Sequence, residues 1–499
     1  MKFRPLQIIF LLSILSTGNV FAQTYTDLLR FSQKYYQGTA RSAASGNAFG
    51  ALGADFGAIS INPAGLGMYR RPELTFGLGY NQQSADATYF GETARDDKHN
   101  LNMSNLGLVL ADVKYQLGKP VQQGWVSVNY AFGFNRTNNF HNNIAVEGLN
   151  PDNSIVHSWR EEAQGRTYSS LNQFSYPFLG AQVGLIQTIN IEDSSTRWED
   201  ITSRENQADF KVRQGDYIST RGSAYDIKFS VAGNYSNKFY LGANIAVPTI
   251  GYRSSRSFSE TNNAGNSAVI YNGTNFTEDV RTSGFGITAG FGAIYRASDA
   301  IRLGASLQLP TFYSMYDQYS TEITGYRKDR NYTYKTPNGQ YEYSIVTPMR
   351  ATFSSAVLFG KSGFISADLE WIDYTSARIS TASDNSRIQN RRVREIYKST
   401  GNLRLGGEYR IENIALRGGY ELHGSPFQAN LVPDKFNGAT SIIAAGIGFR
   451  DADYYIDFTY QYITNNYFHL PYSLQEEEVK GANINNTRSN IMITVGSKF

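Results

Sequence analysis

The chain has 499 residues, of which 18% are charged, with a formal net charge of +3 and no cysteine. So small a charge creates no field that would attract nucleic acid, and we expect no nucleic-acid partner. The fold cannot rely on disulfides, and a chain of this length can bury enough surface to be stable without them.

The first 22 residues have the pattern of a secretory signal peptide. Lys2 and Arg4 precede an apolar run from Leu6 to Leu15, and Val20-Phe21-Ala22 is an acceptable cleavage site. We therefore expect a signal peptide over residues 1–22 and a mature chain that begins at Gln23. The apolar run is shorter than the roughly 20 residues that a membrane-spanning helix needs, and the rest of the sequence predicts no such helix either.

Residues 23–72 are rich in Ala, Gly and Ser, too small to pack a core of their own. The segment contains Asn62-Pro63-Ala64-Gly65. Pro63 fixes its own φ and favours an extended Asn62, while Gly65 permits a positive φ. We expect a hatch, or plug, over residues 23–72, whose corner feeds the first strand of a barrel. Asn62, Pro63 and Ala64 fit either a structural corner or a gate, and the turn chemistry favours the corner.

From Glu73 onward the chain alternates apolar and polar residues in fourteen runs. They lie at residues 74–80, 106–110, 126–134, 225–231, 239–247, 285–295, 301–309, 343–359, 365–371, 403–409, 416–422, 443–449, 454–462 and 491–499. A period of two predicts strands, and many runs reach the length of a tilted membrane strand.

The connections alternate between short turns and long polar loops, as in outer-membrane barrels. The sequence therefore predicts an all-β fold, a 14-stranded antiparallel transmembrane β-barrel over residues 73–499 with the hatch in its lumen. An even number of strands places both termini on the periplasmic side. The expected location is the cell outer membrane, with outer-membrane lipid as a partner and a monomer as the assembly.

The longest loop, at about residues 137–222, is expected to be extracellular. Its candidate ligand-groove residues are Phe174, Tyr176, Phe178, Leu179, Val183, Leu185, Ile186 and Ile189. Four of them, Leu179, Val183, Ile186 and Ile189, have near-helical spacing and predict an amphipathic helix. They could line an external apolar groove for a hydrophobic ligand, or they could pack the loop onto the barrel mouth. Both interpretations remain open.

Two further groups carry predictions. Asp368, Glu370 and Arg404 fall on inward-facing positions, where we expect contacts with lumen water or with the hatch. The last strand ends on Phe499, a terminal aromatic residue that resembles the signal read by the outer-membrane barrel insertion machinery. That machinery is therefore an expected partner.

The chain resembles the FadL/TodX family of outer-membrane transporters for hydrophobic molecules. The resemblance rests on Asn62-Pro63-Ala64-Gly65 at the end of the hatch, the Gly-rich Phe49–Asp55 before it, fourteen strands and the terminal Phe499. The segments Phe364–Tyr374 and Leu403–Tyr409 also look like strands of this family. The resemblance covers essentially the mature chain. The sequence is similar to a Bacteroidetes-type branch of this family.

The resemblance implies passive uptake of hydrophobic small molecules such as long-chain fatty acids. Family members capture a ligand near the extracellular loops, pass it toward the hatch and release it sideways through the barrel wall. A second interpretation is a non-transporting barrel that serves as a structural or secretion-complex component. A haem receptor is a weaker one, since the five histidines are scattered.

The sequence favours no enzyme and implies no cofactor or metal. It contains neither a Gly-x-Ser-x-Gly elbow nor a His-Glu-x-x-His pair. Gly360-Lys361-Ser362 mimics the end of a phosphate-binding loop, but strands flank it on both sides. We therefore expect a hairpin turn at this position.

Overall fold

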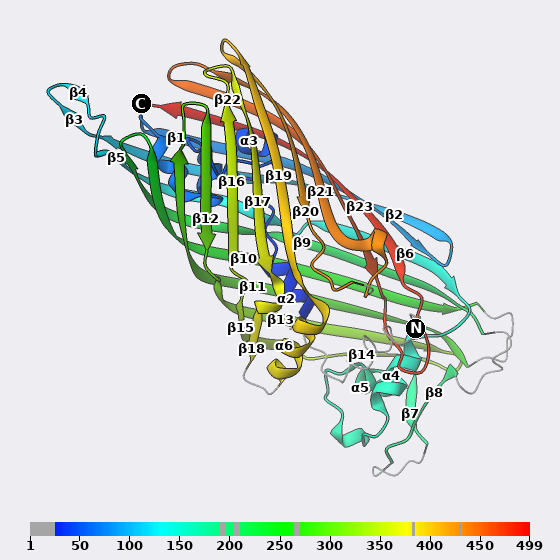
Figure 1. Cartoon of the computed structure of the whole chain (residues 1–499). Coiled ribbons are helices and arrows are strands. Elements are labelled where there is room, and N and C mark those ends of the chain that lie inside the picture. Colours follow the sequence, from blue (N-terminus) through cyan, green and yellow to red (C-terminus); the bar gives the residue numbers. More distant parts are fainter. Residues whose placement is uncertain (1–24, 190–194, 203–209, 264–269, 382–384, 430) are drawn as a thin grey trace, which may run out of the picture.

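The computed structural model describes residues 25–189, 195–202, 210–263, 270–381, 385–429 and 431–499, so the expected signal peptide lies outside the described residues. Within these ranges the strands close into a 14-stranded antiparallel barrel, and the N-terminal segment lies inside it (Figure 1). The fold class predicted from the sequence is confirmed. No helix among these residues has the length and apolar character needed to cross a membrane.

The strands are β1 (Glu73–Tyr89), β2 (Glu92–Val113), β3 (Tyr115–Gln116), β4 (Lys119–Pro120), β5 (Trp125–Asn139), β6 (Asn142–Asn150), β7 (Ile186–Thr188), β8 (Trp198–Asp200), β9 (Val212–Tyr235), β10 (Phe239–Asn262), β11 (Tyr271–Arg296), β12 (Ile301–Gln308), β13 (Phe312–Arg327), β14 (Asn331–Lys335), β15 (Gly339–Val346), β16 (Arg350–Leu358), β17 (Gly363–Asp373), β18 (Arg378–Thr381), β19 (Ser399–Ile411), β20 (Ile414–His423), β21 (Asn437–Arg450), β22 (Tyr454–His469) and β23 (Ala482–Lys498).

The helices are α2 (Tyr25–Ser32), α3 (Ala40–Ala44), α4 (Ile155–Ala163), α5 (Tyr176–Gln182) and α6 (Asn385–Ile396), with short 3-10 turns η1 (Gly57–Ser60), η2 (Pro63–Met68), η3 (Tyr168–Ser170), η6 (Tyr374–Ser376) and η7 (Asp434–Phe436).

Each strand pairs with its neighbours in chain order, and β1 pairs with β23 to close the ring. Four positions around the wall hold two strands in line: β5 with β6, β12 with β13, β16 with β15, and β17 with β18. Pro310 and Pro348 lie at two of these interruptions. Proline has no N–H to donate to a ladder, which explains why pairing stops there.

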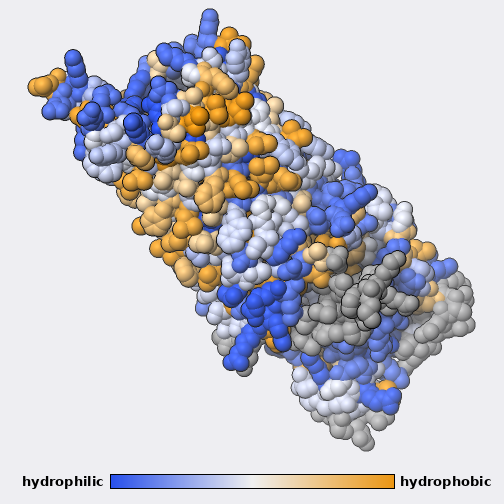
Figure 2. Space-filling view, in the orientation of Figure 1, coloured by the Kyte–Doolittle hydropathy of each residue, from blue (hydrophilic) through white to orange (hydrophobic). Residues whose placement is uncertain are grey.

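An apolar band covers the outside of the barrel. Figure 2 shows hydrophobic side chains gathered between the end that carries the short turns and the hydrophilic surface around α6. On β10 the exposed residues Leu241, Ile245 and Val247 belong to this band, and Phe285 and Phe291 continue it on β11. An apolar outer face with a polar inner face is the pattern of a membrane barrel.

Several strands extend well past the apolar runs that predicted them. The run at 239–247 predicted only the first part of β10, which continues to Asn262. Likewise, the loop expected at 137–222 contains β6 at one end and the start of β9 at the other, so the connection itself spans about residues 151–211. Beyond the band the outward residues are polar, so the ladder continues without the hydropathy alternation that reveals it.

The hatch runs from α2 to η2 and is almost entirely buried. Its backbone rests directly on glycines of the wall. A Cβ at Gly242 would lie 2.4 Å from the carbonyl carbon of Pro63, and one at Gly292 would lie 1.9 Å from Asn62 Oδ1. A Cβ at Gly419 would lie 2.0 Å from the nitrogen of Gly46. Only glycine allows these approaches, so the wall is shaped to seat the hatch.

Charged groups of the inner wall also hold the hatch. Asp368 accepts from the backbone N–H of Gly50 at 3.0 Å, and Glu370 pairs with Arg404 at 2.9 Å. Arg350, which also pairs with Glu370, donates to the backbone oxygen of Ser32 in α2. Asp368, Glu370 and Arg404 are almost fully buried. Of the two expected roles, contact with the hatch is the one that the structure shows.

We predict that Gly242→Ala loosens the corner of the hatch and leaves the barrel intact. The added Cβ cannot fit against Pro63, and overpacking of this kind costs about 1–3 kcal/mol. Hydrogen exchange of residues 57–68 should therefore become faster.

Gly418→Ala is the matched control, because a Cβ there meets nothing within 4 Å. Unchanged exchange in the Gly242 variant would contradict the seating of the hatch on the wall.

Candidate functional site

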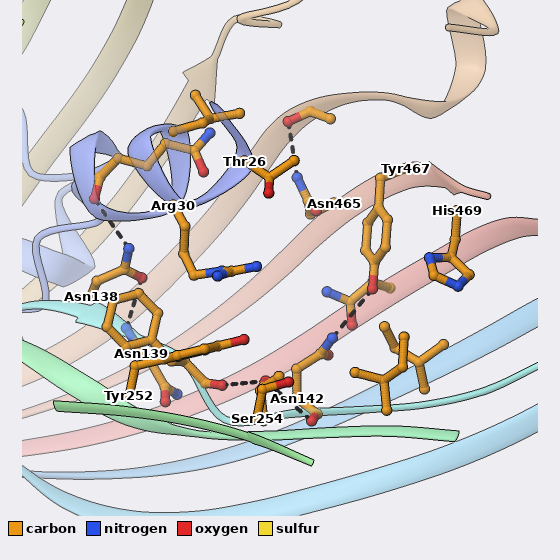
Figure 3. A pocket seen from close by; sticks show the side chains of 18 of the residues that line it. Thr26, Arg30, Asn138, Asn139, Asn142, Tyr252, Ser254, Asn465, Tyr467 and His469 are labelled. Atoms are coloured by element: carbon orange, nitrogen blue, oxygen red, sulfur yellow. Dashed lines mark hydrogen bonds between the residues drawn. The ribbon is translucent and has the colours of Figure 1, made fainter. Parts of the chain in front are cut away.

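A cavity of about 840 Å³ lies between the hatch and the loops that cover the barrel mouth. Its floor includes residues of α2, and its wall includes the β5–β6 bend and parts of β9, β10 and β21–β23. Figure 3 shows Arg30 of α2, Tyr252 of β10, and Asn142 and Tyr467 facing the same space. This is the size of space in which proteins commonly bind small ligands.

One part of the lining is apolar. The rings of Phe140 and Tyr252 line it and pack with the buried ring of Phe31 behind them, with centroid distances of 5.6–6.0 Å. Aliphatic side chains from several elements also line the cavity: Leu29, Ile144, Ile218, Val280, Ile442 and Ile463. These groups come from the hatch and from well-separated strands, so the surface exists only when the barrel is closed around the hatch.

The other part of the lining is polar and rich in amides. Asn138, Asn139, Asn142, Asn465 and Asn486 line it. Asn142 donates to the hydroxyl of Tyr467 at 3.2 Å, one of the bonds drawn in Figure 3. Such groups can accept and donate hydrogen bonds but carry no charge.

The charges around the cavity are only partly balanced. Arg30 pairs with Asp27, and Arg256 pairs with Asp216 at 2.8 Å. Arg488 instead donates to two backbone oxygens, at 3.4 and 3.5 Å. Among the described residues no carboxylate lies within ion-pair distance of Arg488.

A second such arginine lies directly behind the cavity wall. Arg136 is fully buried and donates to Gln37, Asn139 and Ser223. It too has no carboxylate within ion-pair distance in the described part of the chain. Both arginines contact Asn139, one through the side chain and one through the backbone. An unbalanced positive charge in a low-dielectric site favours an anion beside it.

The wall beside this arginine pair contains a break in the backbone ladder. β2 pairs with β5 from Val113 to Asn105 only, and beyond that point β6 pairs with β9 alone. β6 has bent inward and packs against the inner face of β1. On the outside the break lies beside Leu101 of β2, which is 74% exposed and pairs with Tyr80 of β1 but has no strand partner on the side of the break. The break therefore reaches the level of the apolar band.

Contacts with the hatch explain the bend. The backbone N–H groups of Tyr35 and Gln37 donate to the carbonyls of Thr137 and Arg136. Asn138 donates to the backbone oxygen of Gln33 at 3.1 Å, and the register between β5 and β9 shifts at this point. The hatch thus takes the place of β2 as a partner of this edge.

Polar side chains bridge the break. Lys98 of β2 donates to Asn143 of β6 at 2.9 Å and to Ser219 of β9 at 2.6 Å. The amide of Gln83 in β1 bonds both backbone groups of Asn143, accepting at 2.9 Å and donating at 3.3 Å. These are side-chain contacts, which can rearrange without breaking a ladder.

The candidate groove residues lie in a cap over the barrel mouth, built from α4, η3, α5, β7 and β8. Of the four residues that predicted a helix, only Leu179 lies in one, since α5 ends at Gln182, Val183 caps it and Ile186 belongs to β7. Leu179, Val183, Leu185 and Ile186 are 0–1% exposed in the core of the cap. They form the core of the cap, and ligand contact stays a prediction for them.

The other candidate groove residues differ in their surroundings. Phe174 packs on Tyr319 and Phe178 on Tyr334, while Ile189 is exposed. Tyr176 lines the cavity. Burial, together with the neighbouring Glu278 carboxylate, raises the pKa of Tyr176 well above its usual range, so its hydroxyl stays protonated and donates to Glu278. Ligand contact stays a prediction for Tyr176.

The hatch motif forms the expected corner. Asn62 is extended, and its Oδ1 accepts from the N–H of Ala64 at 3.0 Å to start η2 at Pro63. Its Nδ2 donates to Gly50 of the hatch and Ala293 of the wall. Gly65 does not use the positive φ that glycine permits, since it is absent from the residues with that geometry. Glycine is needed there because a Cβ would lie 2.8 Å from Gly53.

Gly360-Lys361-Ser362 forms the turn between β16 and β17, as expected. Phe499 ends the chain beside Pro72, and its role in barrel insertion stays a prediction. Among the described residues no three His, Asp or Glu side chains are grouped to hold a metal ion.

Arg136, Arg488 and the asparagines of the cavity were not predicted from the sequence. Asn486, Arg488 and Asn490 occupy alternate positions of β23, opposite in parity to the outward Ile491 and Ile493. This position in the alternation predicts that their side chains point into the barrel. Their meeting with β5 and α2 depends on the bend, which has no sequence signal of its own.

No protein-family model matches the chain, and no curated protein matches it in sequence. Solved structures do share its fold. The toluene transporter TodX of Pseudomonas putida matches with a TM-score of 0.54 and 13% identity, over 94% of this chain and 99% of that one. A FadL homologue of Pseudomonas aeruginosa matches with a TM-score of 0.51 and 11% identity, over 93% and 99%. The resemblance inferred from the sequence is confirmed at the level of the fold.

We predict that Gln83→Ala releases β6 from β1. The variant leaves the N–H and C=O of Asn143 without their partner, and an unpaired buried group costs about 1–3 kcal/mol, or roughly 5- to 150-fold faster exchange of residues 142–150. Gln82→Ala is the control, since Gln82 faces outward on the same strand. Equal exchange in the two variants would show that Gln83 does not hold the bend.

Proposed function

We propose that the chain is an outer-membrane channel for passive uptake of hydrophobic small molecules, with long-chain fatty acids as the preferred class. The observation that carries the proposal is the position of the cavity. It lies between an outer cap and the hatch, and the β5–β6 bend that forms part of its wall also borders the break in the barrel ladder.

The solved structures with this fold support a hydrophobic cargo, because TodX is a toluene transporter and the other match is a FadL homologue. The apolar band on the barrel exterior supports an outer-membrane location.

The route runs from the cap to the cavity and then sideways. A ligand in the cavity lies against Phe140 and Asn139, and Asn139 also contacts Asn100 of β2 across the break at 3.3 Å. Rearrangement of Lys98 and Asn143 opens the break toward the apolar band outside. Release at that level transfers an apolar molecule into lipid without crossing water, so the hydrophobic effect favours the last step.

The arginine pair selects for an acid. A carboxylate beside Arg488 would supply the anion that the described part of the chain does not place there, and the aromatic cluster would hold the alkyl chain. Neutral hydrophobic molecules can enter the same space, but the charge of Arg488 adds nothing to their binding free energy.

Arg488→Met tests the selection. We expect weaker binding of a long-chain fatty acid by about 10-fold or more, because a charge-assisted hydrogen bond contributes roughly 1.5–3 kcal/mol. Binding of the fatty alcohol of equal length should change little, and Arg488→Lys should restore part of the acid affinity. Isothermal titration in detergent measures both ligands. Equal losses for acid and alcohol would contradict a role for the charge.

A reversible cross-link tests the route. Lys98→Cys with Ser219→Cys, joined by a cleavable linker about as long as a lysine side chain, ties β2 to β9 across the break. We expect uptake of labelled fatty acid into liposomes to fall at least several-fold and to recover when the linker is cleaved. The control is Thr88→Cys with Thr93→Cys, which face each other in an intact ladder.

Unchanged uptake in the cross-linked protein would exclude release through the break. If the unmodified protein accelerates uptake of neither acid nor alcohol over empty liposomes, the non-transporting barrel becomes the better interpretation.

A further inference from the structure

Three arginines form a row on the outside of the barrel. Arg253 of β10 is the ladder partner of Arg221 on β9 and of Arg281 on β11. All three are exposed. They have the same strand parity as the outward Ile227, Val247 and Phe285, with no register shift between, so they lie on the lipid-facing side.

The row is electrostatically unfavourable as it stands. Like charges on directly opposed strand positions repel each other. Asp279, 3.6 Å from Arg253, is the one carboxylate within ion-pair distance of the row among the described residues. By contrast, Arg213 on the same strand as Arg221 pairs with both Glu92 and Glu147. The row therefore has an excess positive charge that other exposed arginines of this region do not have.

A recess separates the arginine row from the apolar band. The next outward positions are Ser223, Gly251 and Ser283, which are ladder partners in the same way. A Cβ at Gly251 would meet nothing within 4 Å, so the recess is open. Tyr225 and Phe285 form the far side of the recess, where the band begins. The hydroxyl of Ser283 and three guanidinium groups thus lie around an open strip beside an apolar surface, while the hydroxyl of Ser223 accepts from the buried Arg136.

The row lies just beyond the polar headgroup layer of a membrane, within reach of arginine side chains. Arg281 lies four residues beyond Phe285, or about 13 Å along the strand and about 10 Å along the membrane normal for a strand tilted by roughly 40°. The headgroup layer extends roughly 5–8 Å from the hydrocarbon on each side. Arginine side chains can reach back toward it over the small residues of the recess.

We infer that this recess binds the phosphate group of a multiply acylated glycolipid in the outer leaflet. The guanidinium groups would pair with the phosphate, Ser283 would donate to its oxygens, and the acyl chains would lie along the apolar band below. The site is outside the barrel and distinct from the cavity. It requires the barrel to reside in an outer membrane but is independent of whether it transports anything.

The test is retention of lipid A by the full-length mature chain in detergent, followed by native mass spectrometry. We expect the unmodified protein to retain diphosphorylated lipid A roughly tenfold more than the dephosphorylated form. The triple variant Arg221→Gln, Arg253→Gln, Arg281→Gln should lose this preference. Gly251→Trp should also lose it, because the indole fills the recess while all charges remain.

Two variants serve as matched controls, and both should retain lipid A as the unmodified protein does. Arg213→Gln removes an exposed charge that already has partners, and Gly418→Trp fills another open outward position. Equal retention of both lipid forms, or normal retention by the triple variant, would overturn the inference. So would displacement of the lipid by inorganic phosphate, which would identify a site for free anions instead.

Discussion

A wall in contact with lipid must bond every backbone N–H and C=O group within the protein, and this requirement governs the whole molecule. Among the described residues, the ring of ladders from β1 round to β23 meets it with short interruptions at Pro310 and Pro348 and one long break beside β2. There the edge of β5 is bonded by Tyr35 and Gln37 of the hatch, and β6 is held inside by Gln83. The break is therefore possible only because the hatch is present. The bend therefore depends on the hatch, and the cavity depends on both.

The polar interior serves the same arrangement. A hatch of small residues cannot build its own core, so it is held by wall glycines and by buried ion pairs. Arg41 of the hatch pairs with Glu408, which pairs with Arg417, which in turn pairs with Asp457. Buried pairs of this kind add little net stability but require one geometry, which fixes the position of the hatch. Because α2 of the hatch forms the floor of the cavity, the fixed position of the hatch also fixes the position of that floor.

Much of the fold could be predicted because lipid imposes a strict alternation on the outward residues. All fourteen apolar runs fall on strands of the barrel wall. Beyond the band the constraint disappears, so the upper parts of β9, β10 and β11 and all of β6 were not predicted. The corner at Asn62 could be predicted from local turn chemistry. The placing of Leu179 and Val183 in a cap core, and of Arg488 beside Asn139, could not, since each depends on contacts between distant segments.

The interrupted ladder also has a mechanical consequence. A closed ring of hydrogen-bonded strands resists widening equally around its circumference, because any increase in girth must break a complete ladder. A ring with one seam held by side chains yields at that seam first, since Lys98 and Asn143 can exchange partners while every other ladder stays intact. The barrel therefore has one line along which its wall can separate without loss of a backbone ladder. The circumference can change along this one line while the rest of the wall keeps its shape.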